Sequence, residues 1–78
     1  MSKRIMVVDD SRIVQLQMQK ILSDSDYQVV ACCQSGEDAL AEYDKVDPDL
    51  VTMDILMPGM DGLETARLIL EKHPKARV

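Results

Sequence analysis

Three short runs of apolar residues divide the chain, and longer polar stretches separate them. The runs span residues 5–8, 29–33 and 50–53. None of them alternates strictly between apolar and polar side chains, so each predicts a strand covered on both faces, as in a parallel sheet. The runs begin roughly 23 residues apart, which leaves room for one helix in each crossover.

A helical pattern occupies the first gap between these runs. Ser11 is placed to cap the helix at its amino end, because a serine side chain there accepts a hydrogen bond from a free backbone N–H. A period of 3.6 residues predicts a buried stripe of Val14, Met18, Ile21 and Leu22. The same period predicts that the side facing water carries Gln15, Gln17 and Gln19.

Two further helices are predicted in the same way. Ser35 is placed to cap the second helix, and acidic residues in its first turn suit the helix dipole. Its predicted apolar face consists of Ala39, Leu40 and Tyr43. The third helix opens near residues 62–63 and ends at residues 73–74, since the residue before a proline resists the helical conformation. Its predicted apolar face consists of Leu63, Ala66, Ile69 and Leu70.

Strands that alternate with helices over such short connections predict an α/β fold. Right-handed crossovers in a doubly wound sheet of strand order 2-1-3 place the first helix on one face and the other two on the opposite face. Residues 76–78 look like the start of a fourth strand. We therefore expect residues 1–78 to form a single partial domain of three βα units plus the beginning of a fourth.

Composition and charge narrow the class of protein. Acidic residues outnumber basic ones by 14 to 9, which gives a net charge of −5 and argues against nucleic-acid binding by this segment. Cys32 and Cys33 are adjacent, so they fit neither a CxxC pair nor a zinc site, and buried free thiols are expected. Free thiols suit a reducing cytosol. With no signal peptide and no run long enough to cross a bilayer, we expect a cytoplasmic protein without membrane contact.

Acidic residues follow two of the apolar runs directly. Asp9 and Asp10 end the first run and Asp54 ends the third, so all three should meet at the switch point of the sheet. Oxygen ligands with open positions suit a hard divalent ion such as Mg²⁺, for which Mn²⁺ can substitute. A carboxylate beside such an ion can attack a phosphoryl group. On its own, an aspartate at a strand end is more often part of a turn or a helix cap than of a metal site.

The loop after Asp54 makes the pattern specific. Pro58 stiffens this loop, while Gly59 and Gly62 allow backbone conformations closed to other residues. With the segments 5–11, 35–40 and 48–62, the chain resembles the receiver domain of two-component response regulators of the chemotaxis-regulator type, which has a flavodoxin-like fold.

The resemblance implies a role for each matched residue. Asp54 would be the phospho-acceptor, which takes its phosphoryl group from the phosphohistidine of a histidine kinase. Asp10 would bind Mg²⁺ directly and Asp9 through water. The backbone carbonyl of Leu56 would be a further ligand, and the backbone N–H of Met57 would lie near the phosphoryl oxygens. Such a domain is a regulatory phospho-acceptor and not an enzyme.

Only three of the family's five βα units have counterparts here. The family's Ser/Thr after strand four and its Lys after strand five have none, so we expect this chain to be impaired in switching an output partner. The third strand would also present an open edge, which predicts a homodimer through that edge.

Two other functions fit parts of the pattern. One is an aspartate-nucleophile phosphohydrolase, although Leu56 stands where such enzymes carry a second carboxylate. The other is a scaffold that keeps the fold without being phosphorylated. Dinucleotide and P-loop sites are excluded, because neither GxGxxG nor GxxxxGK[ST] occurs.

Overall fold

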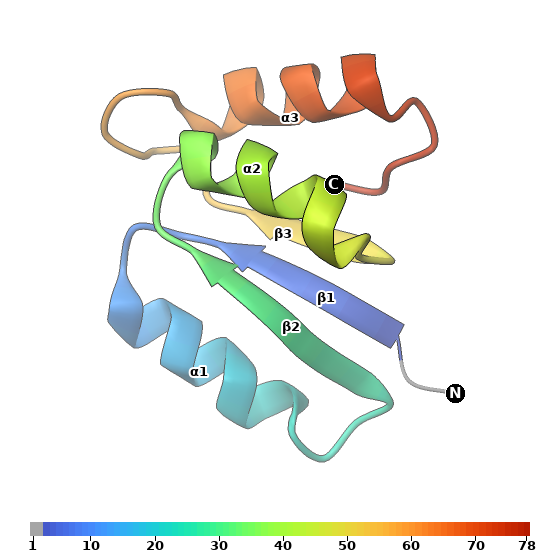
Figure 1. Cartoon of the computed structure of the whole chain (residues 1–78). Helices are drawn as coiled ribbons and strands as arrows, with labels where there is room; N and C mark the ends of the chain where they lie inside the picture. The colour runs from blue at the N-terminus through green and yellow to red at the C-terminus, as the bar shows by residue number, and fades with distance from the viewer. Residues whose placement is uncertain (1–2) are drawn as a thin grey trace.

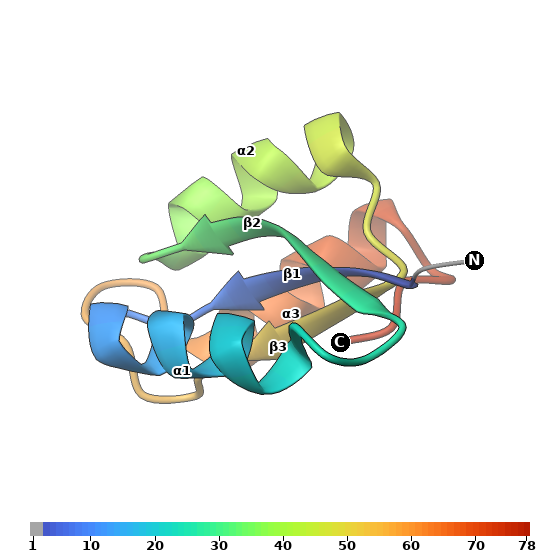
Figure 2. The same cartoon turned by 90° about the horizontal axis from the view of Figure 1, so that it is seen from below.

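The computed structural model describes residues 3–78 and shows one parallel sheet with helices on both faces (Figures 1 and 2). In chain order, its elements are β1 (Lys3–Val8), α1 (Arg12–Leu22), β2 (Tyr27–Cys33), α2 (Gly36–Val46), β3 (Leu50–Met53) and α3 (Gly62–Lys72). The strand order is β2-β1-β3. Helix α1 covers one face of the sheet, and α2 and α3 cover the other (Figure 1). The predicted α/β fold and the 2-1-3 strand order are confirmed.

Strand β1 is the centre of the sheet and is covered from both sides. Its last four residues, Ile5–Val8, are 0–2% exposed, which explains why the sequence shows an unbroken apolar run there. Val8 is in register with Cys33 of β2 and with Met53 of β3. The three strands therefore end level, and the residues that follow β1 and β3 lie side by side.

The main core lies between the sheet and helices α2 and α3. Met6, Val8 and Val51 of the sheet pack there with Tyr43 of α2 and Ile69 of α3. Each such side chain contributes about 1.5–3 kcal/mol when it leaves water. Because α2 and α3 are anchored by this core, the loops at their amino ends are held close to the ends of the strands.

The predicted helix caps are present. The side chains of Ser11 and Ser35 accept hydrogen bonds from the N–H groups of the third residues beyond them, and Asp61 caps α3 in the same way. Asp61 was not foreseen as a cap, although aspartate is among the residues favoured there. Helix α3 ends at Lys72, before His73 and a proline, as expected.

The predicted buried face of α1 is wrong in part. Gln15, expected to face water, is 4% exposed, whereas Ile21, expected inside, is 70% exposed. Apolar side chains surround most of this helix, including Ile13 and Leu16, which are also exposed. The periodicity of these apolar residues therefore does not define a single face. Helix α1 packs on the sheet through the side that carries Gln15.

Helix α3 shows a similar shift. Thr65 and Ile69 are 0% and 1% exposed, so they form the buried face together with Gly62. Leu63 and Leu70, which were predicted to be buried, are 66% and 41% exposed. For α2 the predicted face is confirmed, with Ala39 and Tyr43 buried and Leu40 half-buried.

Residues 76–78 lie beside β3 without forming a strand. One backbone hydrogen bond joins them to the sheet, from the N–H of Val51 to the carbonyl of Arg77, at 2.8 Å. The predicted beginning of a fourth strand is thus limited to this single contact at the outer edge of β3.

The two cysteines point to opposite faces of β2, and only one of them is fully buried as predicted. Cys33 is buried in the core, and burial raises the pKa of its thiol to about 11. Cys32 is only half-buried, and its sulfur accepts a hydrogen bond from Gln19 of α1. Both are free thiols. Within residues 3–78, no helix has the length and hydropathy needed to cross a bilayer.

Candidate functional site

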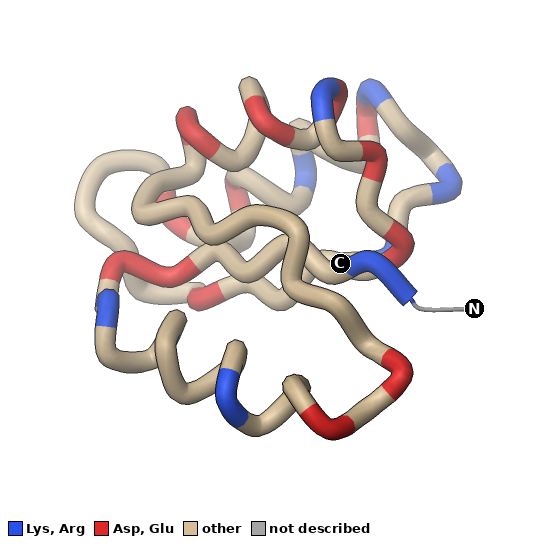
Figure 3. Tube along the Cα trace, turned by 60° about the horizontal axis from the view of Figure 1, so that its bottom comes forward, with Lys and Arg blue, Asp and Glu red and all other residues tan. Residues whose placement is uncertain are grey.

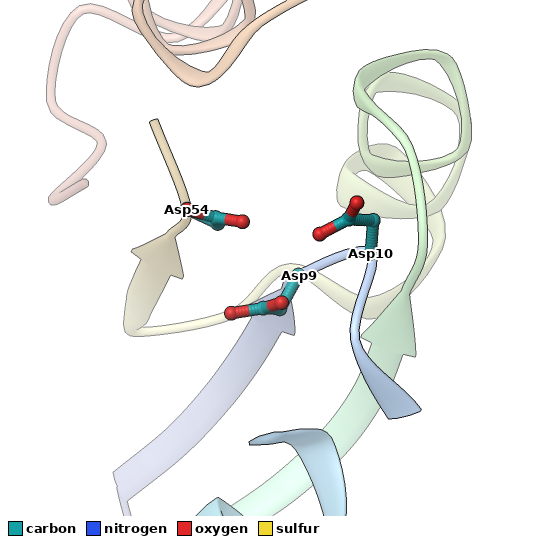
Figure 4. Close-up of side chains that lie close together, drawn as sticks. All are labelled: Asp9, Asp10 and Asp54. Carbon is teal, nitrogen blue, oxygen red and sulfur yellow. The ribbon is translucent and has the colours of Figure 1, made fainter. Parts of the chain in front are cut away.

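Three aspartates converge at the carboxyl ends of β1 and β3. Asp9 and Asp10 follow β1, and Asp54 follows β3. The N–H of Asp54 donates to the carbonyl of Val8 at 2.9 Å, which extends the β1–β3 pairing by one residue beyond the strands. One carboxylate oxygen from each aspartate lies within 4.8 Å of those of the other two. Figure 4 shows the carboxylates of Asp10 and Asp54 pointing toward each other across the ends of the two strands. The predicted convergence is present.

Asp9 is held at several atoms. Its carboxylate Oδ1 accepts a hydrogen bond from the N–H of Ser11 at 2.8 Å. Its own N–H donates to the carbonyl of Cys33 at 2.9 Å, and its carbonyl accepts from the side-chain amide of Gln15 at 2.8 Å. Asp9 is half-buried, whereas Asp10 is exposed. Sequence reasoning missed Gln15, because a glutamine in a helix normally faces water.

Asp54 opens the loop that connects β3 to α3. Its Oδ1 accepts a hydrogen bond from the N–H of Leu56 at 3.3 Å, which orients the carboxylate. Leu56 is 83% exposed, while the side chain of Met57 is 7% exposed and packs in the core. The loop therefore turns outward at Leu56 and is anchored at Met57. The roles expected for the Leu56 carbonyl and the Met57 N–H remain predictions.

Glycine at position 62 allows α3 to approach the acidic residues. A Cβ at this position would collide with the carbonyl of Asp54 and lie 2.8 Å from the Cα of Ile55. The N–H of Gly62 donates to the carbonyl of Ile55 at 2.9 Å. Gly59 serves a different purpose, because its φ of +74° belongs to a region that other residues rarely adopt. Glycine is therefore needed at position 62 for the close approach of α3, and at position 59 for the backbone conformation of the loop.

The charge at this end of the molecule is negative. Acidic positions lie in the β1–α1 connection, with Arg12 next to them at the start of α1, and further basic positions lie at the start of β1 and after α3 (Figure 3). No Lys or Arg side chain within residues 3–78 forms an ion pair with Asp9, Asp10 or Asp54. Carboxylate oxygens gathered without a protein cation are a donor set that fits a hard divalent ion. The residues present therefore fit Mg²⁺.

Comparison with known proteins agrees with this fold. The sequence profile of the response regulator receiver domain matches residues 5–78, which is nearly the whole chain. The chain belongs to the response regulator receiver domain family, whose members serve two-component and chemotaxis systems.

Relatives that match most of the chain include a chemotaxis protein and response regulators of other kinds. The chemotaxis protein CheY of Listeria monocytogenes is 44% identical over 75 residues, which are 96% of this chain and 63% of that protein. The chain therefore spans a little under two thirds of this relative's length.

Two of the similar solved structures contain Mg²⁺ together with a beryllium fluoride. The CheX–CheY–BeF₃–Mg²⁺ complex of Borrelia burgdorferi matches with a TM-score of 0.92 and 32% identity, over 97% of this chain and 58% of that one. The response regulator TrrA of Thermotoga maritima, in complex with Mg²⁺ and BeF, matches with a TM-score of 0.88 and 38% identity, over 95% of this chain and 64% of that one.

Proposed function

We propose that this chain is a phosphorelay receiver in which Asp54 accepts a phosphoryl group from the phosphohistidine of a histidine kinase. The observation that carries the proposal is the convergence of the Asp9, Asp10 and Asp54 carboxylates at the ends of adjacent strands. An oxygen of Asp54 attacks phosphorus, so a P–O bond forms while the P–N bond of the donor breaks. The imidazole leaves with that electron pair and takes up a proton, and Asp54 carries an acyl phosphate.

The site would act with Mg²⁺, for which Mn²⁺ can substitute. When bound, the ion offsets negative charge on the attacking and transferred oxygens. Asp10 and Asp54 would ligate it directly, Asp9 through water, and Leu56 through its backbone carbonyl. The N–H of Met57 would donate to a phosphoryl oxygen. The relatives from Borrelia and Thermotoga that contain Mg²⁺ together with a beryllium fluoride support this assignment.

A regulatory role fits the site better than hydrolysis does. A phosphohydrolase needs an acid or base beside the nucleophile, and the residue two positions after Asp54 is the exposed, apolar Leu56. We therefore assign the chain as a phospho-acceptor and not as an enzyme. Residues 1–78 would form three βα units of a single receiver domain, a histidine kinase and an output partner would be its partners, and switching by these residues alone would be impaired.

A second copy of the chain would also be a partner. Strand β3 lies at an edge of the sheet, and edge strands offer backbone groups to other chains. Helix α1 packs on β1 and β2, so the α1 side of β3 is left open. A dimer joined at the β3 edges would pair the free backbone groups of this strand and cover its open side.

Trapping of the acyl phosphate tests the proposed phosphotransfer. The chain is incubated with a small phosphodonor, with and without Mg²⁺, then reduced with borohydride and analysed by mass spectrometry. We expect an adduct on Asp54 that requires the metal, is lost in Asp54→Asn and is strongly reduced in Asp10→Asn. Asp24→Asn, which lies far from the site, is the matched control and should be labelled like the wild type. An adduct on another aspartate would overturn the assignment, whereas a low yield on Asp54 would not.

A further inference from the structure

Gln15 is a buried polar side chain that the proposed chemistry does not use. It is 4% exposed and is the only buried residue of α1. Leaving an amide buried without hydrogen-bond partners is costly in free energy. An apolar residue would avoid that cost, and α1 already exposes several of them, such as Ile13 and Ile21. The burial of Gln15 must therefore be explained by the hydrogen bonds that its side chain makes.

The Gln15 amide joins the ends of two strands. Its Nε2 donates to the carbonyl of Asp9 at 2.8 Å and to the carbonyl of Cys33 at 3.2 Å. An amide nitrogen carries two hydrogens, so both bonds can form at once and both donors are satisfied. The Cys33 carbonyl also accepts the N–H of Asp9 at 2.9 Å. A single side chain of α1 thus holds the carbonyl of Asp9, just after β1, and that of Cys33, the last residue of β2.

This arrangement controls where Asp9 and Asp10 lie. With Gln15 on its carbonyl and Ser11 on its carboxylate, Asp9 is fixed on both sides of its Cα. Asp10 begins at the carbonyl that Gln15 holds, so its direction toward Asp54 depends on the same bond. A neutral amide supplies these donors without adding a positive charge beside the carboxylates.

We propose that Gln15 is a positioning residue, which holds the Asp9–Asp10 turn in the geometry that a divalent cation needs. This inference rests on the proposed metal site. Partners that orient metal ligands typically change metal affinity by 10–100-fold when they are removed. Replacing the amide by an apolar group of similar size should therefore weaken metal binding while the fold is retained.

Binding of Mn²⁺ to the metal-free chain, followed by electron paramagnetic resonance, tests this role. Gln15→Leu should bind Mn²⁺ about tenfold more weakly than the wild type. Gln17→Leu, a change on the exposed side of the same helix, should bind as the wild type does. A Gln15→Leu chain that is folded and binds with unchanged affinity overturns the proposal.

The outcomes separate this proposal from the proposed function. If the wild type binds Mn²⁺ and loses it in Asp10→Asn, the metal site stands whatever Gln15→Leu does. If the wild type does not bind, both proposals fall together.

A measurement on the unmodified chain covers the case in which Gln15→Leu fails to fold. The two side-chain amide protons of Gln15 should exchange slowly with water in nuclear magnetic resonance spectra, because both are hydrogen-bonded and buried. Their signals should shift on addition of Mg²⁺ with the same midpoint as the backbone N–H of Asp10. Signals that do not respond to Mg²⁺ would overturn the proposal as well.

Discussion

Gly62 lies at the closest approach between α3 and the acceptor loop. We expect Gly62→Ala to lower the free energy of unfolding by about 1–3 kcal/mol, because the added methyl group would overlap the backbone of Asp54. Relief of that overlap must move Asp54 or α3, so Mn²⁺ affinity should fall as well. Urea unfolding and Mn²⁺ titration of the same variant measure the two effects.

Gly59→Ala is the matched comparison in the same loop. A Cβ at this position meets no atom within 4 Å, but the φ of +74° is unfavourable for alanine by about 1–2 kcal/mol. We expect Gly59→Ala to be less stable than the wild type and to retain Mn²⁺ affinity. Equal losses of metal affinity in the two variants would contradict the account of Gly62.

The acidic residues of the site could be predicted individually, and their surroundings could not. Asp9, Asp10 and Asp54 directly follow apolar runs, and the topology of a parallel sheet then determines that they meet. Gln15 gave no such signal, because a glutamine on a helix normally faces water and its two acceptors come from other segments of the chain. Burial of a polar side chain depends on tertiary hydrogen bonds, which periodicity does not encode.

The carboxyl ends of helices α2 and α3 are joined by a small ionic cluster. Asp44 of α2 contacts the Nζ of Lys72 at 2.8 Å and the Nε2 of His73 at 2.7 Å. The ring of His73 also lies against that of Tyr43, with centroids 4.6 Å apart. The hydrogen bonds from Lys72 and then from His73 hold the pKa of Asp44 below its ordinary value.

This cluster predicts how the stability of the α2–α3 pair depends on pH. A carboxyl whose pKa is lower in the folded state stabilises that state above its unfolded pKa, near pH 4, and loses this effect as pH falls through the folded pKa. We expect Asp44→Asn to lower the urea midpoint at neutral pH, and this effect should shrink as pH falls through the lowered pKa of Asp44. Asp24→Asn should show no such pH-dependent difference. A difference for Asp44→Asn that persists unchanged at low pH would contradict the ionic explanation.

Elements were easier to predict than the faces that they bury. Strand positions, helix caps and helix ends follow from local chemistry, such as Ser11 and Ser35 at amino ends and Pro74 after α3. The buried faces of α1 and α3 were displaced because apolar residues occur on several sides of both helices. Where Ile21 and Leu63 compete with Gln15 and Thr65 for the interior, only contact with the sheet decides.

The exposed edge of β3 governs the expected association of the whole molecule. One outward N–H of this strand, that of Val51, is paired with Arg77. Between α1 and the sheet, next to the acidic residues, lies an open hollow of about 140 Å³, whose lining includes Val14, Thr52 and Asp54. We expect light scattering to show a mass that rises toward that of two chains as concentration increases into the high micromolar range.

A charge placed beside that edge should prevent the association. Thr52→Lys introduces a lysine into the hollow, which is a common means of blocking edge pairing. Tyr27→Lys adds the same charge on β2 at the opposite edge of the sheet and should leave the mass unchanged. A wild-type chain that remains a cooperatively folded monomer throughout the series would disprove the proposed dimer.

The acidic site at the level ends of β1 and β3 forms only when these two strands pair, and this constrains the order in which the molecule can assemble. Arg4 of β1 forms a hydrogen bond with Asp49, just before β3, and the two are 45 residues apart in the sequence. Gln15 and Cys33, which also form a hydrogen bond, are only 18 residues apart. Closing the longer loop costs more chain entropy, about 0.6 kcal/mol for each doubling of its length. The carboxylate cluster is complete only after this costlier step, because Asp54 arrives with β3.

A divalent cation that binds the completed cluster and not the open chain therefore acts on folding itself. At a concentration about a hundred times its Kd, such an ion would stabilise the closed state by about 2.7 kcal/mol. We expect Mg²⁺ to raise the urea midpoint of the wild type and not that of Asp10→Asn, and equal midpoints with and without Mg²⁺ in the wild type would contradict this coupling. The docking of β3 and the occupancy of the acidic cluster would then be one equilibrium, with the cellular concentration of free Mg²⁺ as one of its controls.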